Sequence, residues 1–198
     1  KIKREKQKTQ DGMDWSALFK TINDIIIEID THFPYKVISV PHAEGDDVIA
    51  VLSKNIQEKS IIISSDKDFT QLQKFKHIKQ YSPIQKKMLS AADPYKYLQE
   101  HIIRGDKGDG IPNILSADNC FVDEIRQTPL RQNLIDTWID DAEIMPEEIK
   151  RNFQRNTKLI DLNEIPQDIY NNIVNTYDGQ KPAMKMKVLN YLIKKRCN

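Results

Sequence analysis

This sequence of 198 residues has little cysteine, no long apolar run and almost no net charge. The two cysteines, Cys120 and Cys197, lie far apart without metal-ligand spacing around them, which excludes a disulfide scaffold and a cysteine-based zinc site. The longest apolar runs are about three to four residues, far below the roughly 20 that a membrane-spanning helix needs. We therefore expect no membrane association and a location in the reducing cytoplasm.

The net charge of +1 predicts neither a nucleic-acid partner nor a membrane surface. The basic residues are grouped, however, because the chain opens with KIKREKQK and is again rich in lysine after residue 180. The mean hydropathy of -0.61 is typical of a soluble globular protein. Since the chain begins at Lys1 and no apolar signal segment follows, we expect a fragment that lacks its natural N-terminus.

The apolar periodicity predicts an α/β fold. A helix is expected from Trp15, with Asp14 as its N-cap, and the segments 35–40, 44–56 and 60–64 read as strand, helix and fully buried strand. Such an order is a βαβ unit with parallel strands, and a third strand is expected at 77–81. Further helices are expected at 94–103, 130–140, 146–156, 167–177 and 184–195. We therefore expect a parallel sheet with flanking helices in residues 1–92 and a helical region in residues 93–198.

Carboxylates follow two of these strands. Glu44, Asp46 and Asp47 come directly after the strand at 35–40, and Asp66 and Asp68 come directly after the strand at 60–64. For the first group, capping of the following helix is an equally good explanation. Because parallel neighbouring strands end at one edge of a sheet, however, four or five carboxylates should meet there. Like charges about 4 Å apart repel by roughly 4 kcal/mol at an effective dielectric of 20, so a shared cation is needed.

A third acidic group lies in the glycine-rich segment RGDKGDGIPN, where Asp106 and Asp109 are three residues apart. Aspartate and glycine are ordinary turn residues, and this segment alone indicates only a turn. The four histidines form no i,i+4 pair, so an all-oxygen ligand set is expected, which suits Mg²⁺ or Mn²⁺. With the first two groups, this turn would complete a two-metal site.

The ordered motifs AEGDD, SSDKDF and GDKGDGIPN resemble the 5′-nuclease superfamily of flap endonucleases and 5′→3′ exonucleases. The contexts DFTQL, KQYSP and LIDLNEIPQDI are similar to its phage ribonuclease H branch, of T-even type. The resemblance implies two Mg²⁺ ions, replaceable by Mn²⁺, and hydrolysis of RNA primers and DNA flaps or nicked ends during replication. It also implies a monomer in the host cytoplasm, with replication proteins such as a single-stranded-DNA-binding protein or a sliding clamp as possible partners.

The resemblance also assigns roles to residues of this chain. It implies metal ligands at seven positions: Glu44, Asp46, Asp47, Asp66, Asp68, Asp106 and Asp109. Of these, the catalytic positions are Glu44, Asp46, Asp66 and Asp68. Contacts with nucleic acid are expected from Lys1, Lys3, Arg4, Lys6, Lys67, Arg104 and Lys107. The first four would end a helical arch, and the turn with Asp106 and Asp109 would open a helix-three-turn-helix element that holds duplex DNA.

The sequence departs from the family in two places. The small-residue run expected after Pro112 is replaced by residues 113–118, which leaves open a potassium site in this turn. Two further family aspartates have no counterpart in this chain, so we expect the chain alone to be inactive. A noncatalytic duplex-DNA-binding module remains the alternative. A phosphatase of the haloacid-dehalogenase type would need its Asp-x-Asp pair at the first strand, and the preceding AEGDD argues against it.

Overall fold

The computed structural model describes residues 14–196. It divides them into two compact units, a larger unit of residues 40–174 and a smaller unit made of residues 14–39 and 175–196. All three acidic groups lie in the larger unit. None of the described helices is long and apolar enough to cross a membrane. The segment with Lys1, Lys3, Arg4 and Lys6, predicted to contact nucleic acid, lies outside the described residues.

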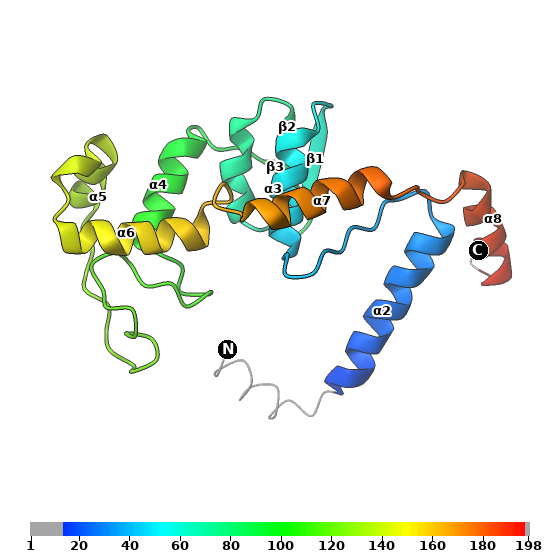
Figure 1. Cartoon of the computed structure of the whole chain (residues 1–198), viewed down its shortest axis with the longest axis horizontal. Helices are drawn as coiled ribbons and strands as arrows, with labels where there is room; N and C mark the ends of the chain where they lie inside the picture. The colour runs from blue at the N-terminus through cyan, green and yellow to red at the C-terminus, as the bar shows by residue number, and fades with distance from the viewer. Residues whose placement is uncertain (1–13, 197–198) are drawn as a thin grey trace. The chain divides into compact units, whose positions relative to one another are not determined.

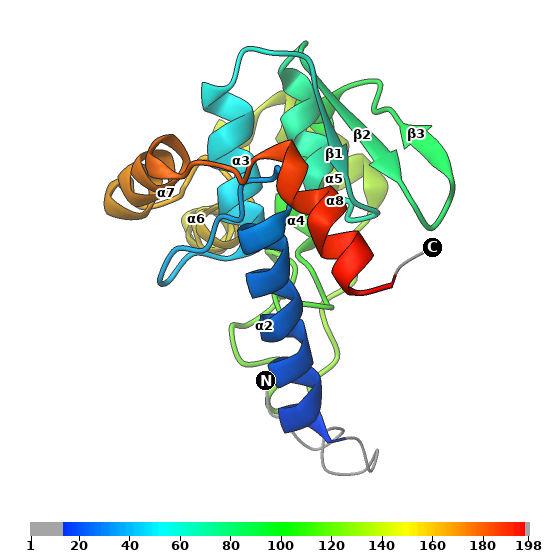
Figure 2. The same ribbon diagram turned by 90° about the vertical axis from the view of Figure 1, so that its right-hand side faces the viewer.

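The larger unit contains a small sheet of three strands, which lie side by side in Figure 2. Strand β1 (Ser60–Ile63) pairs in parallel with β2 (Ile78–Ser82), and β2 pairs antiparallel with β3 (Lys87–Leu89). A 3₁₀ helix, η1 (Asp68–Lys74), connects the two parallel strands. Both β1 and β2 lie where the sequence predicts strands, so these two predictions are confirmed.

One strand prediction was wrong, and one strand was missed. Residues 35–40 belong to no strand, because a segment becomes a strand only when another strand pairs with it, and none does so among the described residues. The expected βαβ unit is therefore not formed. In addition, β3 was missed: it follows a tight turn that begins at Pro83 and has Lys86 at φ 52°, and three residues are too few to show a strand pattern.

The prediction that β1 is fully buried was also wrong. Ile62 is buried, but Ile61 and Ile63 are 59% and 72% exposed. Successive side chains of a strand point to opposite faces, and here the described residues cover only one face completely. Strand β1 also borders a hollow of about 240 Å³, whose lining includes Ile49 and Leu52 of the preceding helix.

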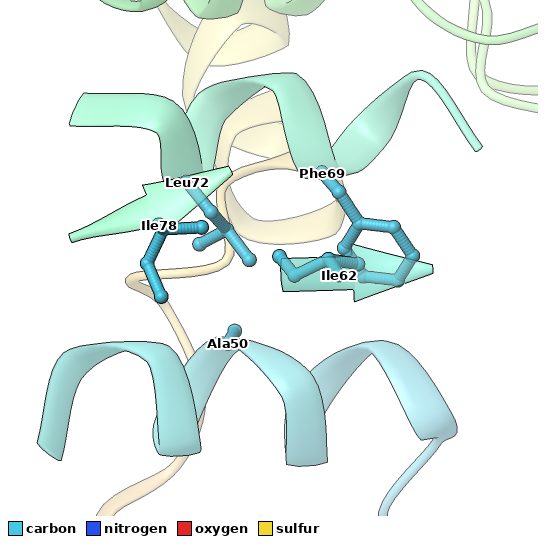
Figure 3. Packing of buried hydrophobic residues seen from close by; sticks show 5 residues of the cluster. All are labelled: Ala50, Ile62, Phe69, Leu72 and Ile78. Carbon is cyan, nitrogen blue, oxygen red and sulfur yellow. The ribbon is translucent and has the colours of Figure 1, made fainter. Parts of the chain in front are cut away.

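Helix α3 (Gly45–Asn55) and η1 pack on the buried face of the sheet. Figure 3 shows Ile62 and Ile78 of the strands between Ala50 on α3 and Phe69 and Leu72 on η1. Val51, on the same helix, is also buried. This apolar cluster fixes the start of α3 and the loop after β1, which carry the first two acidic groups.

Three α-helices of the larger unit lie together in Figure 1. They are α4 (Pro94–Arg104), α5 (Gln132–Asp140) and α6 (Glu147–Ile160), and each confirms a helix predicted from periodicity. Ile103 of α4 packs with Ile135 and Trp138 of α5 in an apolar core. Residues 105–131, between α4 and α5, fold as successive turns.

Side chains of α6 hold this turn segment in place. The buried Asn156 donates hydrogen bonds to the carbonyl oxygens of Ile102 (2.8 Å) and Pro112 (2.9 Å). Asp118, in the segment that departs from the family, accepts hydrogen bonds from Arg151 and Arg155, which lower the pKa of its carboxyl to about 2. The end of α4 and the acidic turn are thus tied to α6.

Replacing Asn156 by alanine should lower the free energy of unfolding by about 2–3 kcal/mol, because the Ile102 and Pro112 carbonyls each lose a hydrogen bond and the Pro112 carbonyl then depends on Arg155. Urea denaturation would measure the change. As a control, Asn171→Ala on α7 (Gln167–Gly179) removes an exposed side chain from a helix and should cost at most about 0.5 kcal/mol. Similar losses in the two variants would contradict the bracing role of Asn156.

The smaller unit contains α2 (Trp15–His32) and α8 (Lys185–Lys194), both at predicted positions. As expected, Asp14 caps α2, where its carboxylate accepts a hydrogen bond from the Ala17 backbone at 3.0 Å. The Tyr191 hydroxyl donates to Glu28 at 2.6 Å and so links the two helices. Helix α2 has no buried residue in the described part of the chain, and its apolar face includes the exposed Phe19.

Candidate functional site

The loop after β1 holds the second acidic group in a fixed shape. Its backbone is held by Gln80 of β2, whose side-chain amide donates to the carbonyl oxygens of Ser64 (3.1 Å) and Asp66 (2.6 Å). Gln80 is fully buried. The Asp66 carboxylate accepts a hydrogen bond from the backbone of Asp68 at 2.9 Å. An uncharged side chain of the neighbouring strand therefore positions both aspartates.

The first acidic group lies at the start of α3. Asp47 accepts a hydrogen bond from the Glu44 backbone at 2.9 Å and so caps the helix, as the simpler of the two interpretations predicts. Asp46 behaves differently. Burial raises the pKa of its carboxyl, and the negative charges of Asp66 and Asp68 raise it further. Asp46 thus lies close enough to the second group to repel it, whereas Glu44 is exposed.

The turn after α4 brings in Asp106 but leaves Asp109 exposed. One Asp106 carboxylate oxygen accepts from the Gly108 backbone at 2.7 Å, and the other lies 2.8 Å from the Lys67 ammonium. Burial alone would raise the pKa of Asp106. The hydrogen bonds from Lys67, Gly108 and His101 outweigh burial and lower this pKa to about 2.

Gly105 makes this turn possible. It ends α4 at φ 67° and ψ -177°, a conformation open to glycine, and a Cβ atom there would lie 2.4 Å from the Ile111 carbonyl oxygen. The Ile111 backbone N–H donates in turn to the Asp106 carbonyl at 2.7 Å. Residues 105 and 106 thus lie close to residues 111 and 112, and this close approach directs Asp106 back toward α4.

His101, on the last turn of α4, is the residue that sequence reasoning missed. It is 8% exposed and lies between two acidic groups, with Nε2 3.2 Å from Asp106 Oδ2 and Nδ1 3.5 Å from Asp68 Oδ1. Atoms of Asp68, His101 and Asp106 lie within 4.8 Å of one another, a grouping able to hold a metal ion. The spacing in the sequence does not indicate this grouping, because Asp68 lies 33 residues before the histidine and Asp106 five residues after it.

The expected basic residues differ in their surroundings. Lys67 is 60% exposed at its side chain and pairs with Asp106, whereas the exposed Arg104 pairs with Glu100 at 2.7 Å and also donates to Gln132. Lys107 is exposed. In this structure the charges of Lys67 and Arg104 are thus balanced by neighbouring acidic residues.

The acidic residues fit divalent cations. Burial raises the pKa of Asp68, the adjacent His101 lowers it, and Asp66 and Asp106 raise it, with a net upward shift. Within the part of the chain that the structure describes, the buried atoms Asp68 Oδ1 and His101 Nδ1 have no hydrogen-bond partner. Partly buried carboxylates that repel one another, next to unsatisfied ligand atoms, are stabilised by a divalent cation.

Two family models match parts of this chain. A family model described as "5'-3' exonuclease, N-terminal resolvase-like domain" matches residues 4–101, and one described as "T4 RNase H, C terminal" matches residues 95–198. The chain is 32% identical over 206 residues to "Ribonuclease H" of Enterobacteria phage T4, which covers 98% of this chain and 68% of that protein.

A solved structure has a similar fold. It is described as "Crystal Structure of T5 D15 Protein Co-crystallized with Metal Ions", and the superposition has a TM-score of 0.55 at 19% identity, over 89% of this chain and 75% of that one. The expected α/β fold with a helical C-terminal region is confirmed. The matched family is one of metal-dependent nucleases that act on nucleic acids. The chain thus belongs to the 5′→3′ exonuclease family and, within it, to the group that includes T4 ribonuclease H.

Proposed function

We propose that this protein is a 5′→3′ nuclease that removes RNA primers, DNA flaps and nicked 5′ ends during replication by two-metal hydrolysis of phosphodiesters. The observation that carries the proposal is the convergence of three acidic groups, distant in sequence, on one side of the larger unit. Asp46 interacts with Asp66 and Asp68, and His101 joins Asp68 to Asp106. Capping alone does not account for this convergence.

In this proposal Asp46, Asp66 and Asp68 hold the cations directly. Glu44, Asp47, Asp106 and Asp109 complete the negative charge around them. Bound Mg²⁺, or Mn²⁺ in its place, supplies a Lewis acid that activates a water molecule and offsets charge on the phosphate. Gln80 keeps Asp66 and Asp68 in place throughout, because its bonds to the loop carbonyls involve no ionised group. No side chain needs to act as a nucleophile.

The helical residues 93–198 would hold the duplex in this proposal. Lys67, Arg104 and Lys107 would contribute positive charge at the border of the acidic site, and the N-terminal Lys1, Lys3, Arg4 and Lys6 would contact the 5′ end. Contacts to phosphates release counterions, so binding should weaken as salt rises. In this proposal replication proteins, such as a single-stranded-DNA-binding protein or a sliding clamp, would be its partners.

A cleavage assay tests the proposal. Substrates labelled at the 5′ end, a DNA flap, a nicked duplex and an RNA–DNA hybrid, are incubated with the full-length protein, since the 198-residue chain alone is expected to be inactive. The incubations contain Mg²⁺, Mn²⁺ or EDTA. We expect short labelled products with either metal, none with EDTA, and recovery when metal is restored. Cleavage that persists in EDTA would contradict the metal mechanism. Tight duplex binding without cleavage of any substrate would instead favour the noncatalytic DNA-binding module.

A further inference from the structure

We propose that His101 Nδ1 and Asp68 Oδ1 are two ligands of one divalent transition-metal ion, which this site binds in preference to Mg²⁺. The inference deepens the proposed function, since Asp68 belongs to the same acidic site, but it concerns metal binding without substrate. The all-oxygen set expected from the sequence includes no nitrogen ligand.

The distance between the two atoms supports this assignment. They are 3.5 Å apart, longer than the ordinary range of about 2.7–3.2 Å for a hydrogen bond from nitrogen to oxygen. Two ligands bound to one ion at about 2.1 Å, at angles between about 90° and 110°, lie roughly 3.0–3.5 Å apart. The pair is therefore spaced as ligands of a shared ion, at the upper end of this range.

The burial of the two atoms gives independent support. Both are buried, and neither has a hydrogen-bond partner among the residues that the structure describes. Buried polar atoms without partners are costly, and such atoms in a native structure commonly mark an ion or water site. His101 is 8% exposed, so its ring is held in the protein interior while Nδ1 is directed at the acidic group.

Asp106 has a different part in this arrangement. Its Oδ1 accepts from the Gly108 backbone, and its Oδ2 accepts from Lys67 and lies 3.2 Å from His101 Nε2. When His101 Nε2 carries the proton and donates it to Asp106, the lone pair is on Nδ1, which faces Asp68. A carboxylate that holds the far nitrogen of a metal-binding histidine fixes both the tautomer and the ring orientation. Asp106 is therefore a positioning residue for His101.

The ligand types determine which ion is preferred. Mg²⁺ favours oxygen ligands and retains several waters, whereas imidazole nitrogen suits first-row transition metals. A mixed nitrogen and carboxylate pair should therefore bind Mn²⁺ and, more tightly, Co²⁺. Mg²⁺ would gain little from the histidine.

Pulsed electron paramagnetic resonance of Mn²⁺ added to the protein tests the assignment directly. We expect modulation from a coordinated imidazole nitrogen in the original protein, its loss in His101→Gln, and its retention in the control His77→Gln. The glutamine amide can still donate to Asp106 but offers no nitrogen lone pair. Calorimetry should show Co²⁺ binding weakened by about 10–100-fold in His101→Gln, with Mg²⁺ binding changed by less than about threefold.

Absence of nitrogen coupling in the original protein, or its persistence in His101→Gln, would overturn the assignment. If His101→Gln does not fold, a variant in which His32, His42 and His77 are all replaced by glutamine leaves His101 as the sole histidine. The nitrogen signal must then remain, and its loss would also overturn the assignment. Because these measurements need no nucleic acid, a failure of the cleavage assay would leave their outcome unaffected.

Discussion

Replacing Asp68 by asparagine in the full-length protein is expected to reduce cleavage by at least about a thousandfold, which corresponds to about 4 kcal/mol of transition-state stabilisation. Asp68 is half-buried, interacts with both Asp46 and Asp106, and has one carboxylate oxygen without a hydrogen-bond partner in the described structure. An amide in its place is a weaker ligand and carries no charge. Cleavage rates of flap and nicked substrates at fixed Mg²⁺ would measure the loss.

The stability of this variant separates a ligand from a structural residue. Because burial, together with the neighbouring carboxylates, raises the pKa of Asp68, its ionised form is unfavourable in the folded state. Asp68→Asn should therefore have an equal or higher free energy of unfolding. The control Asp24→Asn removes an exposed carboxylate that pairs with Lys20, and it should change neither quantity. An Asp68→Asn protein that cleaves at the original rate would refute the catalytic role.

Replacing Gly105 by alanine is expected to lower the free energy of unfolding by about 3 kcal/mol or more. The new Cβ atom would lie 2.4 Å from the Ile111 oxygen and 2.5 Å from the Pro112 oxygen. Both contacts are with backbone, so the turn itself must move, and the positive φ adds strain. We also expect weaker metal binding, because displacement of the turn takes Asp106 away from His101.

Gly110→Ala is the matched control for this prediction. Gly110 lies in the same turn and also has a positive φ, 77°, but no atom lies within 4 Å of the position of its Cβ. Only the cost of the left-handed conformation applies there, about 1–2 kcal/mol. Urea denaturation and Mn²⁺ titration of both variants would separate the two effects. Equal destabilisation would show that the close approach at Gly105 contributes nothing.

The features that the sequence predicted well depend on local patterns. The helices α3, α4 and α6 follow from apolar residues at helical spacing, and the start of α2 follows from Asp14 as a capping residue. The convergence of Asp46 with Asp66 and Asp68 was also anticipated, although by a partly wrong route. It was derived from two parallel strands, whereas in the structure α3 itself packs against β1 and η1 through Ala50.

The features that it did not predict depend on contacts distant in sequence. Residues 35–40 have the composition of a strand, yet strand formation requires a partner. His101 has an ordinary position on a helix, and only the fold reveals that its two ring nitrogens face Asp68 and Asp106. Nothing in the sequence indicated that Gln80 holds the loop after β1. A glutamine in a strand does not reveal in the sequence which backbone groups its side chain contacts.

The attachment of α6 to the acidic turn also determines how this region can open. One amide, that of Asn156, serves a carbonyl at the end of α4 and another in the turn, so release of α6 would uncover both at once. The Ile114 amide hydrogen, bonded to the Ile103 carbonyl, would then exchange with solvent only when α6 detaches. The turn and α6 thus form one cooperative unit of local unfolding. The glycine-rich turn that carries Asp106 thereby acquires the slow opening of a packed helix.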